Sequence, residues 1–212
     1  LGTASQVPTA TRNHNGYLLR WDGEGLLFDP GEGTQRQFTR LGLSASCITR
    51  ICLTHFHGDH CLGLPGVVQR LALDGASHPV PVHFPASGGE YYERLVKASA
   101  FVGEIDLRPE PLPASGAEIE AGPLRLIARP LAHGIDVLGY RLVEPDRRTF
   151  EPARLAALGI EGAAVGRLER EGSLIVAGRR VTVEEVSHLL VAEVLALVLD
   201  SGPTPGIDDL VA

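Results

Sequence analysis

Residues 54–60 read Thr-His-Phe-His-Gly-Asp-His, and this stretch decides the fold that the sequence predicts. It follows an apolar run, residues 48–53, that has the length and composition of a buried strand. In an extended segment His55 and His57 project from the same face, because side chains alternate with a period of two. Imidazole nitrogens bind zinc and the neighbouring transition metals. This strand end therefore offers two imidazoles to one metal ion.

The second half of the stretch supplies another pair of ligands. Gly58 allows the backbone to turn sharply, which brings Asp59 and His60 round at the start of the next helix. A single histidine is more often a core or surface residue than a ligand. Three histidines and an aspartate in so short a stretch reverse that expectation. We therefore predict that Asp59 and His60 bind a second ion beside the first.

Other strand ends are expected to complete the site, because a two-metal centre requires further ligands. His133 follows an apolar strand and precedes a Gly-Ile turn, so it is the first candidate. Asp200 ends another apolar strand before a Gly-Pro turn and is placed to bridge two cations. An Asx-type turn residue is the alternative for Asp200, and Asp208 or Asp209 would then bridge.

The remaining histidines and the cysteines are expected to have ordinary structural roles. We expect core or surface positions for His14, His78, His83 and His188, of which His14 lies near a predicted active-site loop. Three closely spaced cysteines without a Cys-x-x-Cys pair read as the reduced thiols of an intracellular protein; they are Cys47, Cys52 and Cys61.

Composition limits the possible classes of protein. The chain has 212 residues, which suits one domain with an insertion, and 44% of them are hydrophobic. It contains no apolar run long enough to span a membrane. A net charge of −7 argues against a generally nucleic-acid-binding surface but not against a local basic patch. The sequence lacks methionine, even at its start, so we expect it to be part of a longer polypeptide.

The order of predicted elements favours an α/β sandwich with helices outside. Strands are expected at residues 17–21, 26–28, 48–53, 80–84, 105–107, 124–128 and, fully buried, 191–199. Helices are expected at residues 35–41, with Thr34 or a residue near it as the cap, and at 62–73, 90–100 and 152–158. Residues 116–122 are expected to form turns, and no helix is expected at the C-terminus.

Residues 144–185 differ in composition from the rest of the chain, because charged residues are frequent there and glycines interrupt them. We interpret them as an arm inserted within one domain, residues 1–212, since they have too few apolar residues for a core of their own. An ordinary surface loop with a hairpin is the alternative. Six arginines make this region a candidate for binding phosphates: Arg147, Arg148, Arg167, Arg170, Arg179 and Arg180.

The spacing His-x-His-x-Asp-His resembles the signature of the metallo-β-lactamase superfamily at every position. Within it the chain resembles the ribonuclease Z family over nearly its whole length. The matching segments are the loop of residues 1–13, Phe-Asp-Pro-Gly-Glu-Gly-Thr-Gln at 28–35, Gly-Leu-Pro-Gly at 63–66, His-Gly-Ile at 133–135, Gly-Tyr-Arg at 139–141 and the excursion after residue 144.

This resemblance implies an αβ/βα sandwich with an inserted flexible arm and a truncated C-terminal half. It also implies two Zn²⁺ per subunit. His55, His57 and His133 would hold the first ion, Asp59 and His60 the second, and Asp200 would bridge them. The family's last metal-binding histidine and the histidine that protonates the leaving group would lie beyond the last residue given.

The implied activity is that of an endoribonuclease that removes the 3′ trailer from precursor tRNA. A metal-bridging hydroxide would attack the phosphodiester after the discriminator base and leave a tRNA 3′-hydroxyl. Asp59 resembles the family's proton acceptor and is the predicted catalytic residue. The expected substrate contacts are Arg12 and Asn13 in the N-terminal loop and Arg147 and Arg148 in the arm. A cytoplasmic homodimer is implied as well.

Two departures weaken parts of this resemblance. Ala10 stands where the family usually has a lysine, and the arm lacks the usual Gly-Pro-rich stretch. Two alternatives remain open from the residues alone. One is another hydrolase of the same fold that acts on a small ester or phosphodiester. The other is a non-catalytic paralogue that lacks its C-terminal ligands.

Overall fold

The fold was analysed in a computed structural model that describes residues 1–100 and 103–212. The chain divides into two compact units, and each is described by itself. The first, the sandwich unit, comprises residues 1–142 and 195–212, and the second, the arm unit, comprises residues 143–194. A search of the described residues for a helix of membrane-spanning length and apolarity found none.

Five strands form the first sheet of the sandwich unit, in the order β1-β2-β3-β4-β5. Their bounds are β1 Tyr17–Trp21, β2 Glu24–Phe28, β3 Arg50–Cys52, β4 Val80–Pro85 and β5 Leu107–Leu112. The first two strands form the predicted antiparallel hairpin, and β2 to β5 pair in parallel. Parallel strands require crossovers, so helices separate them along the chain.

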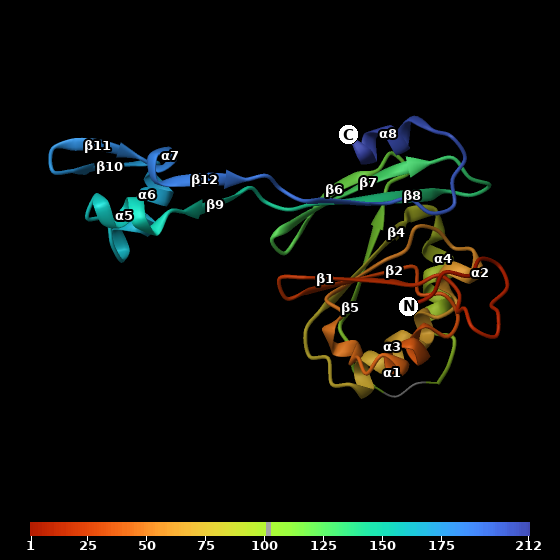
Figure 1. The fold of residues 1–212 in the computed structure, drawn as a ribbon. Coiled ribbons are helices and arrows are strands. Elements are labelled where there is room, and N and C mark those ends of the chain that lie inside the picture. The colour runs from red at the N-terminus through yellow and green to blue at the C-terminus, as the bar shows by residue number, and fades with distance from the viewer. Residues whose placement is uncertain (101–102) are drawn as a thin grey trace. The chain divides into compact units, whose positions relative to one another are not determined.

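Four strands form the second sheet, in the order β13-β8-β7-β6. Their bounds are β6 Ala117–Ala121, β7 Leu124–Leu131, β8 Val137–Val143 and β13 Val194–Leu197. The two sheets face each other, with α1 (Thr34–Arg40), α3 (Leu64–Leu73) and α4 (Gly89–Val96) outside the first sheet and α8 (Pro205–Val211) outside the second (Figure 1). The predicted αβ/βα sandwich is confirmed.

The period of two along each strand divides the core into layers. Leu27 and Ile51 belong to the apolar cluster shared with the helices, whereas Leu26, Phe28 and Cys52 belong to the cluster between the two sheets. A third, smaller cluster lies beneath α8. Each fully buried apolar side chain of this kind stabilises the fold by about 1.5–3 kcal/mol. The β2 and β3 strands are thus fixed from both faces, and the loops that follow them begin from rigid ends.

Several predicted elements differ from the observed ones. The strand predicted at residues 48–53 is shorter and comprises only β3, Arg50–Cys52. A 3₁₀ turn at Ala45–Cys47 precedes it and has Ile48 as its C-terminal cap. The helix predicted at 62–73 begins at Leu64, after a separate turn of helix, α2 (Gly58–Cys61). The helix predicted at 90–100 is α4 and ends at Val96.

The second sheet contains the larger errors. Residues 116–122 were expected to be turns, but five of them form β6, which pairs antiparallel with β7. The strand expected at 191–199 is β13, and it is half exposed rather than buried because it lies at the edge of the sheet. A terminal helix, α8, was not expected, and Pro205 at its first turn starts it.

Smaller errors concern boundaries. The cap of α1 is Gly33, in left-handed conformation, which is next to Thr34 and agrees with the expected place of the cap. Thr34 is the first helical residue, and its hydroxyl donates to the carbonyl of Gly31 at 2.7 Å. The strand expected at 105–107 begins only at Leu107 and continues to Leu112.

The arm unit contains seven short elements: β9 Arg147–Phe150, α5 Pro152–Ala157, α6 Ala163–Glu171, β10 Ser173–Val176, β11 Arg179–Thr182, α7 Val183–Val186 and β12 Ser187–Leu190. Two antiparallel pairs, β9–β12 and β10–β11, frame it. Seven buried apolar residues form a cluster within it: Leu155, Ile160, Leu168, Leu174, Val181, Val183 and Val186. The expectation that this region has too few apolar residues for a core was therefore wrong.

Candidate metal centre

The candidate ligands gather at one edge of the sandwich unit, where strands of both sheets end. The loop with His55 and His57 follows β3, His133 follows β7, and Asp200 follows β13. The carboxyl ends of strands are the usual site of ligand binding in open α/β sheets. The predicted gathering of these residues from distant parts of the chain is found.

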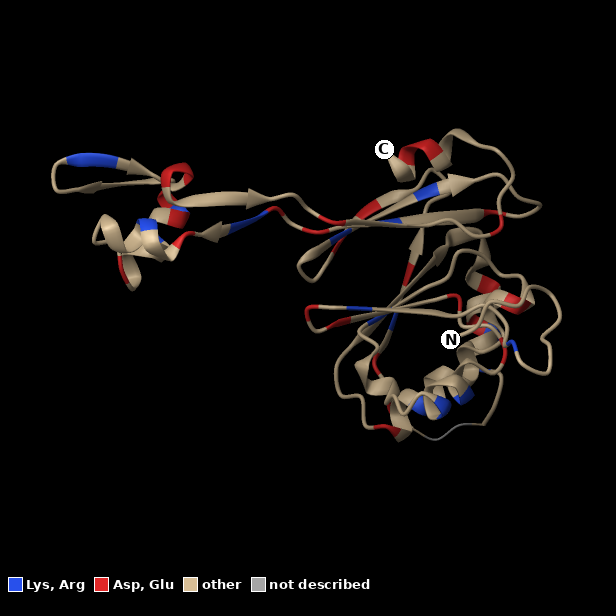
Figure 2. Ribbon diagram, in the orientation of Figure 1, with Lys and Arg blue, Asp and Glu red and all other residues tan. Residues whose placement is uncertain are grey.

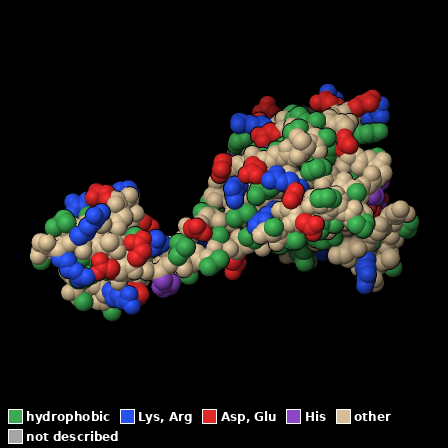
Figure 3. Space-filling view, turned by 90° about the horizontal axis from the view of Figure 1, so that it is seen from above, with side chains coloured by type: hydrophobic (Ala, Val, Ile, Leu, Met, Phe, Trp, Pro, Cys, Tyr) green, Lys and Arg blue, Asp and Glu red, His purple; other side chains and the backbone are tan. Residues whose placement is uncertain are grey.

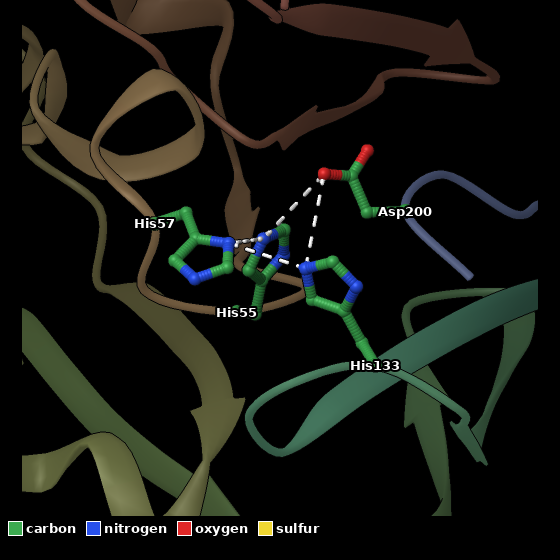
Figure 4. Close-up of side chains that lie close together, drawn as sticks. All are labelled: His55, His57, His133 and Asp200. Atoms are coloured by element: carbon green, nitrogen blue, oxygen red, sulfur yellow. Dashed lines mark hydrogen bonds and ion pairs between the residues drawn. The ribbon is translucent and has the colours of Figure 1, made fainter. Parts of the chain in front are cut away.

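Four side chains converge on one point (Figure 4). His57 Nδ1 lies 3.0 Å from His55 Nε2 and 3.2 Å from His133 Nε2. One carboxylate oxygen of Asp200 lies 4.0 Å from both His55 Nε2 and His133 Nε2. Three imidazole nitrogens and a carboxylate oxygen so arranged match the donor set of a transition-metal ion such as zinc.

The hydrogen bonds behind His55 decide which of its nitrogens is free for a metal. Thr54 Oγ1 donates to Asp29 Oδ2 at 2.6 Å, so its oxygen accepts from His55 Nδ1–H at 2.9 Å. This assignment leaves the lone pair of His55 Nε2 facing the point of convergence. Burial, followed by the charges of His60, His57 and His133, lowers the pKa of His55 to about 3. The ring is therefore neutral at physiological pH, the state that binds metal.

Asp29 organises the site from behind, and the sequence analysis did not identify it. Its carboxylate is fully buried and accepts from the Thr54 backbone N–H at 2.6 Å, from the Thr54 hydroxyl and from His60 Nδ1 at 2.7 Å. Asp29, His55 and His60 lie close enough together to share an ion, but the hydrogen bonds to both oxygens of Asp29 favour a supporting role behind the ligands. Its signal was an aspartate directly after a buried strand, before Pro-Gly.

His60 and Asp59 supply the second pair of candidate ligands. His60 Nε2 lies 3.5 Å from Asp59 Oδ2 and 3.5 Å from Asp200 Oδ2. Burial lowers the pKa of His60, but the hydrogen bond to Asp29 and the charges of Asp29, Asp59 and Asp200 outweigh it and raise the pKa overall. Asn15 Nδ2 lies 3.1 Å from the same His60 nitrogen.

A buried carboxylate oxygen tests whether these residues fit a cation. Asp59 Oδ2 is buried and has no hydrogen-bond partner among the described residues. Such an atom is costly to bury unless a cation neutralises it. Asp200 lies between the two groups of histidines, within 4.0 Å of His55, His133 and His60. The donor set thus fits a metal ion, with Asp200 close to both groups of histidines.

A cavity of about 490 Å³ opens beside the centre. Its walls include His57, Asp59, His133 and Asp200, together with His14. His14 is buried, and its Nδ1 has no hydrogen-bond partner in the part of the chain described, with Glu32 Oε2 4.0 Å away. His14 thus lies beside the centre, near the predicted active-site loop, as the sequence analysis expected.

Other expected residues have structural contacts. Asn13 Nδ2 donates to the Glu32 carbonyl at 2.8 Å and so ties the N-terminal loop to the loop after β2, while Arg12 is exposed beside it. His83 is buried against Arg50, and Cys61 is a buried free thiol whose pKa burial raises to about 12. Neither is part of the ligand cluster.

The arginines of the arm unit are interleaved with acidic residues (Figure 2). Residues 143–194 contain seven arginines and nine acidic residues, a net charge of −2. Arg148 Nη2 bonds Glu184 Oε1 at 3.0 Å, and Arg179 pairs with Glu185. Arg147 and Arg148 lie on β9. The unit is therefore not basic as a whole; its exposed arginines include Arg179 and Arg180 on β11.

Comparison with known proteins agrees with this geometry. The model of the metallo-beta-lactamase superfamily matches residues 10–155. A ribonuclease Z of Nocardia farcinica is 55% identical over 213 residues, which cover 100% of this chain and 70% of that protein. The chain belongs to the ribonuclease Z family of the metallo-beta-lactamase superfamily. A ribonuclease Z of Chlamydia muridarum is 43% identical, over 99% of this chain and 69% of that protein.

A solved structure supports the same assignment to the ribonuclease Z family. Human tRNase Z, short form, superposes with a TM-score of 0.60 at 29% identity, covering 68% of this chain and 62% of that one. The chain spans 70%, 65% and 64% of the lengths of three ribonuclease Z relatives, from Nocardia farcinica, Salinispora arenicola and Thermobifida fusca.

Proposed function

We propose that the protein containing this chain is a zinc-dependent endoribonuclease that removes the 3′ trailer from precursor tRNA and leaves a tRNA 3′-hydroxyl. One observation carries the proposal: His55, His57, His133 and Asp200 converge on one point. Membership of the ribonuclease Z family supports the choice of substrate.

The chemistry divides between the metal ions and the side chains that hold them. Two bound Zn²⁺ would supply the Lewis acidity that activates water near neutral pH and neutralises phosphoryl charge. His55, His57 and His133 would hold the first ion, Asp59 and His60 would contribute to the second, and Asp200 would be a ligand shared by both. Asp29 and Thr54 fix the tautomers of His60 and His55, so the ligand nitrogens do not reorganise when the ion binds.

Asp59 is the proposed proton acceptor for the attacking water. Its Oδ2 is buried at the centre and lacks another partner among the described residues, which keeps it available as a base. Because Asp59 also lies 3.5 Å from His60 Nε2, its alternative role is that of a ligand.

Contacts with tRNA are proposed to come from two regions. Arg12 and Asn13 belong to the loop next to the cavity that His14 lines, and Arg147 and Arg148 belong to the arm unit. We propose that the arm unit grips tRNA through phosphate contacts, since its arginines recur on β9 and β11. A cytoplasmic homodimer completes the proposal, and sedimentation of the full-length protein tests the dimer.

The test is cleavage of a 3′-extended precursor tRNA by the full-length protein, with and without chelator. Asp59→Asn is compared with Asp209→Asn, which changes an exposed aspartate on α8. The described ligand cluster contains Asp200 and not the alternatives Asp208 and Asp209, so Asp209 serves as the control. We expect chelator-sensitive cleavage after the discriminator base, unchanged in the control and reduced about 100-fold or more in Asp59→Asn. Retained metal in Asp59→Asn assigns Asp59 as the base, and lost metal assigns it as a ligand.

Two outcomes would contradict the proposal. If the metal-loaded protein leaves precursor tRNA intact but hydrolyses a small ester or phosphodiester, the protein is another hydrolase of this fold. If it neither binds metal nor cleaves, it is the non-catalytic paralogue.

A further inference from the structure

A second cavity, of about 450 Å³, is also lined by His57. Its walls include Phe56 and Tyr91 on one side and Ile135 on another, with Ser87 and Asp136 as polar neighbours. His57 lines both cavities. A ligand whose reacting group sits at the metal centre can therefore extend into either one.

Phe56 is held rigidly in the wall of this cavity. Its ring meets the buried ring of Phe84 edge-on, with centroids 5.7 Å apart at 80°. Gly88 lies directly against it, because a Cβ at residue 88 would come within 2.0 Å of a Phe56 ring carbon. No side chain other than hydrogen fits at that position, so the ring occupies a preformed place between the ligands His55 and His57.

Tyr91 extends this aromatic surface into solvent. Its ring lies 5.8 Å from that of Phe56 at 31°, and 52% of Tyr91 is exposed. The guanidinium of Arg94 lies 5.9 Å from the Tyr91 ring centroid and pairs with Glu90. Ile135, next but one to the ligand His133, is 42% exposed. Exposed aromatic and aliphatic groups that line a cavity beside a metal centre favour a flat, partly apolar ligand.

We propose that this cavity, lined by Phe56, Tyr91 and Ile135, binds the base of a nucleotide next to the scissile phosphate by stacking on the aromatic pair. The inference rests on the proposed function and adds to it a base subsite. A phosphate at the metal centre places the neighbouring base within reach of a pocket that shares His57. Stacking tolerates every base, because each has a flat π-face. The subsite therefore positions the RNA strand without reading its sequence.

The test uses full-length, zinc-loaded protein and an uncleavable precursor tRNA with a methylene phosphonate at the scissile position. Two such RNAs carry 2-aminopurine, one at the nucleotide 5′ to this linkage and one at the nucleotide 3′ to it. Fluorescence on binding reports stacking and identifies the side that enters the cavity. The variants are Tyr91→Ala, Tyr91→Phe and, as a control, Leu73→Ala, which removes an exposed side chain at the end of α3.

We expect quenching of one probe by the wild type, by Tyr91→Phe and by Leu73→Ala. In Tyr91→Ala the quenching should be lost, and RNA affinity should fall about 10-fold. Zinc content should be equal in all four proteins, because Tyr91 is not a ligand.

Two results would overturn the subsite while the proposed function stands. They are cleavage of natural precursor tRNA by the wild type without quenching of either probe, and equal quenching by Tyr91→Ala and wild type. If the wild type does not cleave precursor tRNA at all, the proposed function is wrong. The proposal that a nucleotide base occupies the second cavity is then wrong as well.

Discussion

The metal centre and the arm unit differ in how their functional side chains are held. At the centre, His55 and His60 are fully buried and each ring is fixed by the Asp29–Thr54 network. In the arm unit, Arg179 and Arg180 are exposed on β11, and the unit has a small apolar cluster of its own. Figure 3 shows Lys and Arg side chains spread over the surface of this unit. A buried polar network positions atoms accurately but fails as a whole when one member is lost. On an exposed surface over a separate core, the loss of one side chain lowers stability or binding only slightly.

The largest effect is expected from Asp29→Ala at the centre. This change leaves three donors without their acceptor: the Thr54 N–H, the Thr54 hydroxyl and His60 Nδ1. Breaking a buried charged network of this kind costs about 3–5 kcal/mol. Urea unfolding and zinc content measure the effect, with Asp209→Ala as the control. Normal zinc content in a stable Asp29→Ala protein would refute the supporting role of Asp29.

Leu168→Ala tests whether the arm unit has its own core. Leu168 is fully buried in the arm cluster, and removal of a buried leucine side chain costs about 2–5 kcal/mol. Hydrogen exchange should rise within residues 143–194 while zinc content stays normal. Ile175→Ala, at an exposed position of β10, is the control. Equal acceleration throughout residues 1–142 would show that the two units unfold together.

The buried His83 predicts a pH dependence within the sandwich unit. Burial, followed by the charge of Arg50, lowers the pKa of His83 to about 4, from 6.5. Between these values the unfolded chain binds a proton that the folded chain does not, so stability falls as the pH falls from about 7 to about 4. The contribution is at most about 3 kcal/mol.

Urea unfolding at pH about 7 and about 5 checks this prediction. His83→Gln should lose less stability over that interval than the wild type does. His188→Gln, at an exposed position of β12, should behave as the wild type. Parallel curves for all three proteins would assign the pH dependence to other groups.

The smallest effect on stability is expected from Arg148→Ala in the arm unit. Its ion pair with Glu184 is partly exposed, and such pairs contribute at most about 1 kcal/mol. If Arg148 contacts a phosphate, RNA affinity falls several-fold and the slope of log affinity against log salt decreases by about one. Arg125→Ala on β7 is the matched control. An unchanged salt slope would remove Arg148 from the interface.

The sequence predicted the parts of the molecule that carry a local pattern. Residues 54–60 contain their ligand types at fixed spacing, and the hairpin of β1 and β2 has a clear turn between apolar runs. The second sheet was harder, because the glycines on either side of β6 are typical of turns and outweighed the alternation of charged and apolar residues that is typical of a strand. Pairing with β7, which lies along the whole of β6, overrides that local signal.

Asp29 and Tyr91 were not identified for a different reason. Each acts through residues that are distant in sequence: Asp29 through Thr54 and His60, and Tyr91 through Phe56. Their local sequence shows only a strand end and a helix. Partners of this kind become visible when the chain's path is known, whereas the ligand spacing is visible in one line of sequence.

The backbone contact that closes the base of the arm has a consequence for how this chain can vary. Glu144 N donates to the Glu193 carbonyl at 3.1 Å, so the segment leaves and returns at neighbouring residues, between β8 and β13. The segment of almost fifty residues therefore joins β8 to β13 in the same way that a short hairpin turn would, with its two ends side by side. Closing a loop depends only weakly on its length. The segment can therefore be lengthened, exchanged or replaced by a short turn, and the neighbouring strands keep their places in the sheet.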